Sequence, residues 1–571
     1  MRPVAPLRLT PAIACLAPAL ATHAPAAARV AAGLFAHDPA TWSRDPSVQQ
    51  TIAQRLGWLD APRTMRPQVA RAVTLAARVR HRGIRDVVLL GMGGSSLAPE
   101  VLRAVIGASD GAPRFQMLDS TDPAAVQAAM TDPATTLYLI ASKSGTTTEP
   151  LALAAHCIDR LRAHGIDRWA DHLVAVTDPG TPLDARARDE QFFDCFLNDP
   201  TIGGRFSALS WFGLVPAALM GIDVVALLDR AVAMLDAAQQ TPDARQNPAV
   251  GLGLLLAAAA REGRDKLTLL TPPSWAALGL WVEQLVGEST GKQGVGVIPI
   301  SGEPMGAADV YGRDRLLVTL EDDAPSPASF ATPTTVTRAL EDTVPGAALT
   351  VSTPLDLGAE FMRWEIATAV AGALLGVNPF DEPNVQQAKQ ATTRLLNAYG
   401  RDRTLPVPPV DTTDASGTSW TLGRAARTGL DGAPAQTFLR LLVPGDYLAV
   451  LVYLGPDATC DAVLTAFRTR VRDALHVATM VSRGPRYLHS TGQLHKGGPD
   501  SAVCVVVTAS AATDIAVPGA AYTFGVLEQA QALGDVLSLE AAGRRVLHIH
   551  LPSPSATHLQ SALDALTAAI A

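Results

Sequence analysis

The sequence of 571 residues contains few cysteines, and none of its five cysteines forms a Cys-x-x-Cys pair. Scattered thiols in so long a chain are typical of a protein in a reducing compartment, and they argue against a disulfide framework or a structural zinc site. Basic residues are in the minority, 46 against 54 acidic ones, and the net charge of −8 argues against nucleic acid as a partner. We expect a cytoplasmic protein without a bound metal.

Long uncharged apolar runs are also scarce. No stretch of about 20 residues free of charges and proline clusters is present, so the sequence predicts no transmembrane helix. Residues 1–30 imitate a signal peptide, because Arg2 and Arg8 precede an apolar run, but Pro11 and Pro18 interrupt that run. We therefore expect neither secretion nor a membrane partner.

The chain is rich instead in strands that alternate with helices. Asp86–Gly91 is a short apolar run that ends in glycine, as a buried parallel strand does. Further strands are expected at 115–118, 136–141 and 173–177, with helices at 98–106, 123–130 and 149–163 between them. This alternation predicts an α/β fold with a parallel sheet between two layers of helices.

The pattern restarts twice, which predicts several domains. We expect an N-terminal helical segment at 1–82 that becomes helical after Pro25, α/β domains at 83–205 and 206–400, and a C-terminal α/β lobe at 401–571. In the C-terminal lobe we expect strands at 447–453, 502–508 and 546–551, a helical stretch at 461–480 and a helix at 522–533. This order matches that of the second domain, and it predicts a partial repeat.

The first candidate site is the loop Gly91–Ser96, which joins a strand to a helix. Glycines at this position let backbone amides approach an anionic ligand. The loop also imitates a dinucleotide fingerprint, with Asp119 in place of the ribose-binding acid, but Ser96 replaces the third glycine. A tight turn without a ligand is the other alternative.

The second candidate site is Ser142–Glu149, which follows a strand and opens a helix. Its cluster of hydroxyls, its exposed amides and the helix dipole suit a phosphate monoester. The alternative is a capping box between Thr146 and Glu149, which explains two residues but not the whole cluster.

Three further segments carry polar residues of catalytic type. In Gly203–Ser207 an arginine follows two glycines, and its guanidinium can reach a ligand. Gln284 and Glu288 are four residues apart and share one helix face. Glu288 lies near the negative end of its helix, which raises the pKa of a carboxyl and suits a general base. Lys389 follows the run Asn378–Asn384, although a lone lysine is more often simply solvated.

Taken together, these five motifs resemble the glucose-6-phosphate isomerase family, in the family's order from about Asp86 to Lys389. The segments 38–60, 91–100 and 381–389 look most like the isomerase half of transaldolase–isomerase fusion proteins, although no transaldolase half is present. The resemblance implies two sugar-isomerase α/β domains, a sugar-phosphate substrate, no cofactor and a functional or fused association with transaldolase. The implied reaction interconverts glucose 6-phosphate and fructose 6-phosphate through an enediolate.

Carried over residue by residue, the resemblance implies a complete site. Glu288 would be the base, Arg205 would face the reacting oxygens, and Lys389 would assist ring opening. The implied substrate-binding residues are Gly94, Ser95, Ser142, Lys143, Ser144, Thr147, Glu149, Gly204, Gln284 and Glu382. Position 382 departs from the family, which has glutamine there, so an extra acid lies near the site.

The family's ring-opening histidine is missing from its usual place. No histidine occurs between Trp275 and Lys389, and the nearest match, His489 in the run His489–Gly497, comes afterwards. Either the function has moved to the C-terminal lobe, or His489 is a plain loop residue. Family members are usually dimers that share sites, which implies a homodimer unless the third lobe supplies in one chain what a partner supplies elsewhere.

Rival functions remain at this point. A non-catalytic phosphosugar-binding regulator on the same fold predicts loss of Glu288 or Arg205, and both are present. A nicotinamide-dependent oxidoreductase predicts the glycine fingerprint that Ser96 breaks. An isomerase of another phosphosugar stays open.

Overall fold

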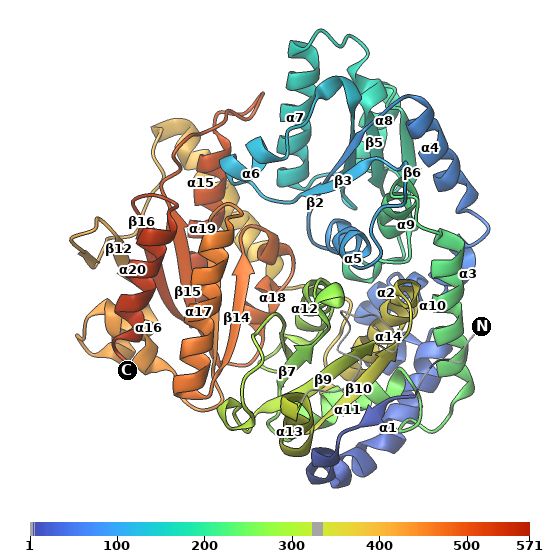
Figure 1. Ribbon diagram of the computed structural model, residues 1–571, viewed down its shortest axis with the longest axis vertical. Helices are drawn as coiled ribbons and strands as arrows, with labels where there is room; N and C mark the ends of the chain where they lie inside the picture. The colour runs from blue at the N-terminus through green and yellow to red at the C-terminus, as the bar shows by residue number, and fades with distance from the viewer. Residues whose placement is uncertain (1–3, 5, 323–334, 571) are drawn as a thin grey trace.

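Three sheets made mainly of parallel strands, each covered by helices, make up the core of the protein (Figure 1). Antiparallel pairing occurs at β1 (Arg8–Leu9) in the second sheet and at β11 (Thr412–Thr413) and β12 (Ser419–Leu422) in the third. The computed structural model describes residue 4 and residues 6–322 and 335–570. Arg2 of the signal-like segment lies outside the described residues, as do residues 323–334 of the expected second domain. The fold is α/β, as the sequence predicts.

The first sheet is built from central strands that are completely buried. Its strand order is β3 (Arg114–Leu118), β2 (Asp86–Gly91), β4 (Thr136–Ala141), β5 (Leu173–Thr177) and β6 (Asp194–Leu197). All neighbours are parallel. Helices α4 (Ala70–His81), α5 (Leu97–Val105), α6 (Pro123–Ala128), α7 (Thr148–Ala163), α8 (Pro182–Asp189) and α9 (Trp211–Leu219) accompany it. Because parallel strands lie between helices, the interior of β2 and β4 is largely apolar with no alternation.

The second sheet follows the long helices α10 (Val224–Gln240) and α11 (Val250–Arg261). Its order is β1 (Arg8–Leu9), β10 (Gly346–Val351), β9 (Arg315–Asp322), β7 (Lys266–Leu270) and β8 (Ile298–Ile300), with only β1 antiparallel among the described strands. Helices α12 (Leu278–Thr290), α13 (Thr335–Thr343) and α14 (Leu357–Leu375) belong to it, and α15 (Val385–Asp402) leads to the third sheet. Every residue of α12 except Leu280 is buried, so this helix runs through the interior.

The third sheet lies in the C-terminal lobe. Its order is β11 (Thr412–Thr413), β12 (Ser419–Leu422), β16 (Arg545–Leu551), β15 (Ala502–Ala509), β13 (Tyr447–Tyr453) and β14 (Ala478–Arg483). Helices α16 (Arg424–Leu430), α17 (Ala458–Leu475), α18 (Gly492–Gly497), α19 (Phe524–Ala541) and α20 (Ala556–Thr567) complete the lobe. Helix α19 packs against α15 and also contacts β15 and β16.

The main parallel strands follow one order in all three sheets. Numbered along the chain within each sheet, they run 2-1-3-4 in β3-β2-β4-β5, in β8-β7-β9-β10 and in β14-β13-β15-β16. In open sheets of this kind ligands bind beyond the carboxyl ends of the strands. The shared order supports the repeat that we proposed from the sequence.

Two expectations from the sequence are wrong. The helical stretch expected at 461–480 ends at Leu475, and β14 begins at Ala478, because His476 takes a left-handed conformation with φ of 56° and the β-branched Val477, Thr479 and Val481 favour a strand. The N-terminal segment becomes helical before Pro25, since α1 spans Ala17–Phe35 and Pro25 lies inside it on an exposed face.

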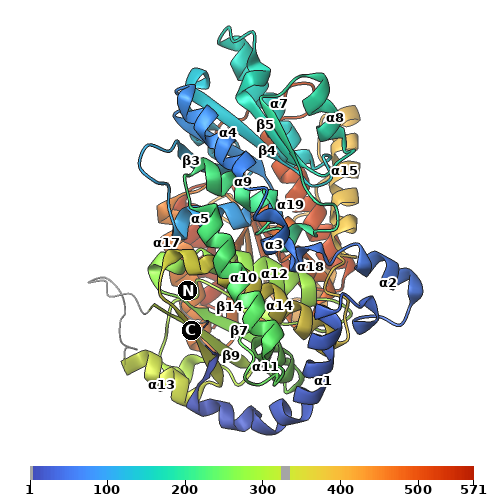
Figure 2. The same ribbon diagram turned by 90° about the vertical axis from the view of Figure 1, so that its right-hand side faces the viewer.

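The N-terminal helix also corrects the expectation about apolar runs. The helical segment Pro11–Phe35 is long and apolar enough to cross a membrane, a test that signal sequences and core helices also pass. In the structure α1 lies at the margin of the molecule beside α11 (Figure 2). Leu20, Ala27 and Leu34 are buried there, while most of the helix remains accessible.

A buried ion pair ties the second and third sheets together. Arg315 of β9 donates to both carboxylate oxygens of Glu303, at 2.9 and 3.1 Å, and to the backbone oxygen of Val477 at 3.2 Å. Glu303 also accepts the backbone amide of Thr479 in β14 at 2.9 Å. The two charged side chains are 0% and 1% exposed, so neither charge can be hydrated if its partner is lost.

We predict that Glu303→Ala lowers the free energy of unfolding by about 3–5 kcal/mol, because it leaves Arg315 buried without a counter-charge. The matched control is Asp564→Ala, which breaks an exposed pair with Arg470 and should cost less than about 1 kcal/mol. Urea denaturation followed by circular dichroism measures both. Equal losses in the two variants would show that the buried pair does not hold the lobes together.

Candidate active site

Backbone contacts bring loops of the first and third sheets together. A Cβ atom added to Gly94 would lie 2.0 Å from the carbonyl oxygen of Gly204, and one added to Gly93 would lie 2.4 Å from that of His489. Gly93 also has φ of 54°, which L side chains rarely adopt. The glycines after β2 are therefore needed for close approach to two other loops.

The same region argues against the dinucleotide alternative. Ser96 donates its hydroxyl to Asp119 at 3.0 Å, and Arg486 of the third lobe forms an ion pair with Asp119 at 2.7 Å. The carboxylate of Asp119, which stands where a dinucleotide-binding protein has its ribose-binding acid, is thus already paired with an arginine of this chain. Ser95, which the resemblance places at the sugar, is buried in the same loop.

The hydroxyl loop after β4 has the geometry of an anion site. Ser142 is buried and donates to the hydroxyl of Thr147 at 3.0 Å, whereas Ser144 is exposed. Thr147 is the N-cap of the 16-residue helix α7 but makes no side-chain cap bond, so its side chain leaves the amide of Thr148 at the start of the helix free, while Pro150 in the same turn has no amide hydrogen. Lys143 pairs with Asp178 beside the loop. Phosphate binding here remains a proposal.

Glu149 does not form the capping box that the sequence allows. Its carboxylate is buried and accepts one hydrogen bond from His489 Nε2 at 2.8 Å and another from Gln531 at 2.6 Å. Burial raises the pKa of this carboxyl, but the nearby His489 and Lys389 outweigh it and hold the pKa below its ordinary value. The hydrogen bond from His489 connects the first sheet to the third lobe.

The predicted base lies at the other side of the His489 loop. Gln284 donates to Glu288 at 3.2 Å and, from the same nitrogen, to the backbone oxygen of His489 at 2.7 Å. Arg205 lies 3.3 Å from Glu288 and is held by Ser289 at 2.7 Å. Burial raises the pKa of Glu288, and the charge of Glu382 raises it further, against the opposing effect of Arg205.

Two charged residues flank this pair at its open side. Glu382 accepts from Arg205 at 3.1 Å, and although burial raises the pKa of Glu382, Arg205 lowers it below its ordinary value. Lys292 binds the backbone oxygen of Asn378 at 2.5 Å and the Asp381 carboxylate at 2.7 Å, and burial lowers its pKa to about 8. Lys292 thus fixes the segment that carries Glu382.

A small cavity of about 60 Å³ opens beside Arg205 and Glu382. It is lined by Arg55, Lys143, Gly203, Gly204, Arg205, Phe206, Phe380 and Glu382. Lys389 lies on an exposed face of α15, and its charge acts on Glu149. The structure therefore brings the residues named from the sequence into one region, with Lys389 at its border.

Three residues of this region were not predicted from the sequence: Arg55, Lys292 and Gln531. Arg55 lies in the segment 38–60, which carries part of the family resemblance but was not assigned a site residue. Lys292 does stand in a conspicuous Gly-Lys pair, which is a usable signal. Gln531 lies within a buried helix, and nothing in its neighbours distinguishes it from a packing residue.

We predict opposite pH effects from two buried carboxyls. The pKa of Glu149 lies below its unfolded value of 4.5, so its charge stabilises the fold above about pH 4.5 and this contribution is lost as the pH falls. Burial raises the pKa of Glu365 in α14 well above 4.5, so its contribution is lost as the pH rises above that value. Thermal unfolding of Glu149→Gln and Glu365→Gln measures both.

The difference in melting temperature between the unmodified protein and Glu149→Gln should shrink as the pH falls from about 6 to 4. Glu365→Gln should instead become relatively more stable between about pH 5 and 8. Parallel pH profiles for the two variants would contradict the assignment of charge to Glu149.

Comparison with known proteins agrees with this geometry. Residues 73–295 match the family model described as phosphoglucose isomerase. The glucose-6-phosphate isomerase of Symbiobacterium thermophilum is 31% identical over 407 residues, which cover 60% of this chain and 87% of that protein.

Solved structures share the fold. The structure of a hypothetical protein from Thermus thermophilus aligns with a TM-score of 0.55 and 26% identity. The alignment covers 68% of this chain and 99% of the Thermus chain. A glucose-6-phosphate isomerase from Chlamydia trachomatis aligns with a TM-score of 0.54 and 19% identity over 68% of this chain and 86% of its own, which shows the fold alone. With its family model and its relatives in agreement, this chain belongs to the glucose-6-phosphate isomerase family.

Proposed function

We propose that the protein is a glucose-6-phosphate isomerase, an aldose–ketose isomerase that interconverts glucose 6-phosphate and fructose 6-phosphate. The observation that carries the proposal is the amide of Gln284, which joins Glu288 to the loop of His489. A carboxyl with a raised pKa, a buried arginine and a histidine paired with a carboxylate thus meet at one place. This is the set of groups that ring opening and proton transfer between carbons require.

Phosphate binding is assigned to the loop after β4. The hydroxyls of Ser142, Ser144 and Thr147 and the first amide of α7, that of Thr148, would hold the phosphate, with Lys143 adding positive charge nearby. Because the phosphate is remote from the reacting carbons, its binding energy positions the sugar. Gly94, Ser95 and Gly204 would line the sugar through backbone and hydroxyl contacts.

Ring opening is assigned to His489, with Lys389 assisting. Glu149 accepts a hydrogen bond from Nε2 of the imidazole, which orients the ring and leaves Nδ1 for the substrate. Nδ1 of the imidazole would take the proton of the C1 hydroxyl, while the ammonium group of Lys389 gives a proton to the ring oxygen. Although burial raises the pKa of Glu149, Lys389 lies close enough for its charge to lower that pKa, which places Lys389 at the edge of the proposed ring-opening site.

Isomerisation itself is assigned to Glu288. Its carboxylate would take the proton from C2 of the open-chain aldose and return it to C1, through an enediolate. The raised pKa makes it a stronger base than a solvated carboxylate. Arg205, fixed by Ser289 and by backbone oxygens, would stabilise the negative charge that develops on the oxygen atoms.

Glu382 gives this site a feature of its own. Its carboxylate shares Arg205 with Glu288, so it weakens the pull of the arginine on the base and keeps the pKa of Glu288 high. With a glutamine at position 382, the charge of Arg205 would act on Glu288 alone and would lower the pKa of the base further. Glu382 therefore adjusts the strength of the base as well as contacting substrate.

The wider setting follows from the activity. We place the enzyme in the cytoplasm, in glycolysis and gluconeogenesis, and propose that it needs no cofactor. All residues assigned to the chemistry come from one chain, so the mechanism itself calls on no partner subunit. A homodimer and an association with transaldolase remain proposals from the family resemblance.

We predict that Glu288→Gln lowers the turnover number by about 10²–10⁴-fold while substrate still binds, because the amide cannot accept the C2 proton. The conversion of fructose 6-phosphate is followed in a coupled assay, and deuterium uptake from solvent at C2 is followed by NMR. Glu283→Gln, on another face of the same helix, is the matched control and should retain turnover. Near-normal turnover of Glu288→Gln would exclude Glu288 as the base.

We predict that His489→Ala affects cyclic substrates more than open ones. Fructose 6-phosphate must open before Glu288 can act, whereas a tetrose 4-phosphate cannot close a ring because its phosphate occupies the required hydroxyl. The loss of kcat/KM should therefore be at least about tenfold larger for the hexose, within the range of general acid–base catalysis. Equal losses for the two substrates would assign His489 a structural role.

A further inference from the structure

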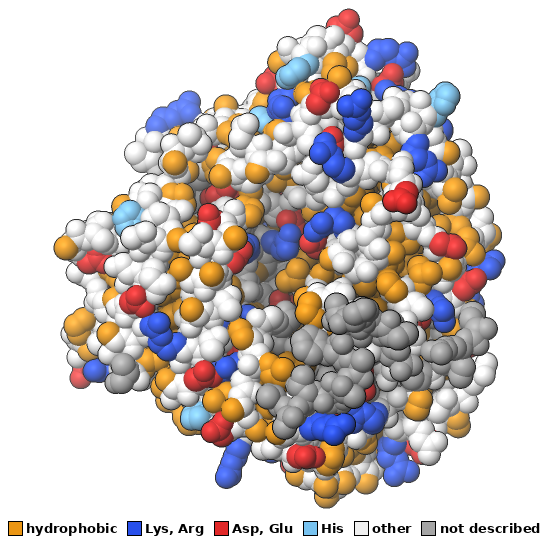
Figure 3. All heavy atoms as spheres, in the orientation of Figure 1, with side chains coloured by type: hydrophobic (Ala, Val, Ile, Leu, Met, Phe, Trp, Pro, Cys, Tyr) orange, Lys and Arg blue, Asp and Glu red, His pale blue; other side chains and the backbone are white. Residues whose placement is uncertain are grey.

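A second cavity lies behind the proposed active site, on another face of α12. Its volume is about 380 Å³, within the usual range for small-molecule sites. It is enclosed by α5, α12, α17, the end of β14 and the loop that follows β14. In the surface view, the face between the third lobe and the other two is hollowed, and basic and acidic side chains gather there (Figure 3).

The cavity has an excess of positive charge. Arg483 is paired with Asp461, and Arg486 is paired with Asp119, so these two guanidinium groups are compensated. Arg468 is 5% exposed and binds the backbone oxygen of Ser301 at 3.2 Å and the Thr479 hydroxyl at 3.3 Å. Among the described residues no carboxylate lies within ion-pair distance of it.

The carboxyls near Arg468 offset its charge only in part. The charge of Glu303 acts on Arg468 most strongly, but Glu303 is already paired with Arg315. Glu283 lines the same cavity and is occupied by Ser301, whose hydroxyl donates to it at 2.7 Å. Burial raises the pKa of Glu283 to about 7, so it is partly protonated at neutral pH. An anionic ligand would therefore complete the charge balance of the cavity.

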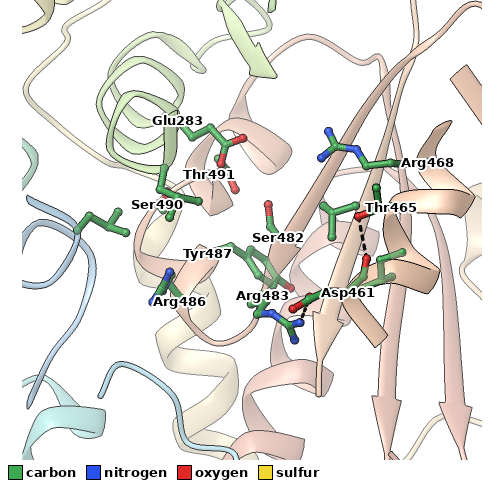
Figure 4. Close-up of a pocket in the computed structure, with 14 residues that line it drawn as sticks. Glu283, Asp461, Thr465, Arg468, Ser482, Arg483, Arg486, Tyr487, Ser490 and Thr491 are labelled. Carbon is green, nitrogen blue, oxygen red and sulfur yellow. Dashed lines mark hydrogen bonds and ion pairs between the residues drawn. The ribbon is translucent and has the colours of Figure 1, made fainter. Parts of the chain in front are cut away.

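An unsatisfied hydroxyl also points to a ligand. Ser482 is 8% exposed, and within the described part of the chain its hydroxyl oxygen has no hydrogen-bond partner. Figure 4 shows Ser482 and Arg468 directed into the cavity, with Glu283 across from them and Arg483 bound to Asp461 below. A buried hydroxyl without a partner is costly, and a ligand oxygen would satisfy it.

The position of the cavity agrees with the topology of the third sheet. Ser482 and Arg483 are the last residues of β14, and Asp461, Leu464, Thr465 and Arg468 share one face of α17. The cavity therefore lies beyond the carboxyl end of a parallel strand, where α/β sheets bind ligands. The proposed phosphate loop occupies the carboxyl end of a strand in the first sheet, after β4.

We propose that this cavity is an effector site for a small hydroxylated metabolite that carries an oxyanion, either a phosphate or a carboxylate. The oxyanion binds Arg468, and the hydroxyls bind Ser482 and its neighbours Ser490 and Thr491. Ser490 directly follows His489, and Glu283 directly precedes Gln284. A ligand here thus contacts the two segments that hold the proposed catalytic histidine and base, and its binding changes the rate of isomerisation.

Binding is tested by isothermal titration with two probes, glycerol 3-phosphate and malate, which distinguish a phosphate from a carboxylate ligand. Saturating fructose 6-phosphate is present throughout, so that the proposed phosphate loop is already occupied. We expect one probe to bind with a stoichiometry of one per chain. Ser482→Ala should weaken that binding about tenfold, since it removes a hydrogen bond to a charged group.

Two further variants separate the cavity from general effects of charge. Thr465→Trp places a bulky side chain at the exposed mouth and should abolish binding, while Asp461→Asn removes a negative charge from the lining and should strengthen it severalfold. The matched control is Asp564→Asn, which removes the same charge from an exposed pair with Arg470 and should leave binding unchanged.

The effect on catalysis is read at saturating substrate. This part rests on the proposed isomerase function, whereas the titration detects binding without any need for turnover. The bound probe should change kcat of the unmodified enzyme and leave kcat of Thr465→Trp unaltered. Failure of both probes to bind, binding that survives Ser482→Ala and Thr465→Trp, or binding without a change in kcat would each overturn the proposal.

Discussion

The hydrogen bond between His489 and Glu149 is the contact on which the proposed site depends. It joins the loop after β14 in the third lobe to the first turn of α7 in the first sheet, and Gln531 holds the same carboxylate from a second helix of the third lobe. Buried charges are stable only when they are paired, so each lobe fixes the position of the other here. The buried pair of Glu303 and Arg315 does the same between the second and third sheets. Because of these two contacts, a histidine from the far end of the chain lies beside a glutamate from its first third.

The three sheets share one strand order, and the carboxyl ends of the first and third carry loops of the proposed site. In the first sheet the loops after β2 and β4 supply glycines and hydroxyls; in the third, the loop after β14 supplies His489. The second sheet contributes differently, since Gln284 and Glu288 lie inside the buried helix α12 rather than in a loop. A base fixed in a helix that is buried along its length has little freedom to move, which suits proton transfer over short distances. The three sheets thus hold the charged residues of the proposed site in place.

Local features can be predicted from the sequence, and distant contacts cannot. The strands Asp86–Gly91 and Thr136–Ala141 agree to the residue, because continuous apolar runs followed by glycine or hydroxyl residues are strong local signals. The loops at 91–96 and 142–149 are recognisable for the same reason. The strand Ala478–Arg483 is hidden, because no glycine or proline separates it from α17 and its β-branched residues are the only sign. That Glu149 binds His489 and does not cap its own helix depends on residues 340 positions apart, and no local pattern carries that information.

The long separation between Glu149 and its partners has a consequence for synthesis of the chain. Gln531 lies 382 residues after Glu149, so at ordinary translation speeds roughly 20 to 80 seconds pass between the addition of the two residues. During that interval the first sheet can fold, since its strands are consecutive in the chain. Its glutamate, however, must remain hydrated until the last third of the polypeptide leaves the ribosome. With the proposed site, which needs His489, the nascent protein would therefore be inert as an isomerase for most of its own production, and activity would begin as a single late event.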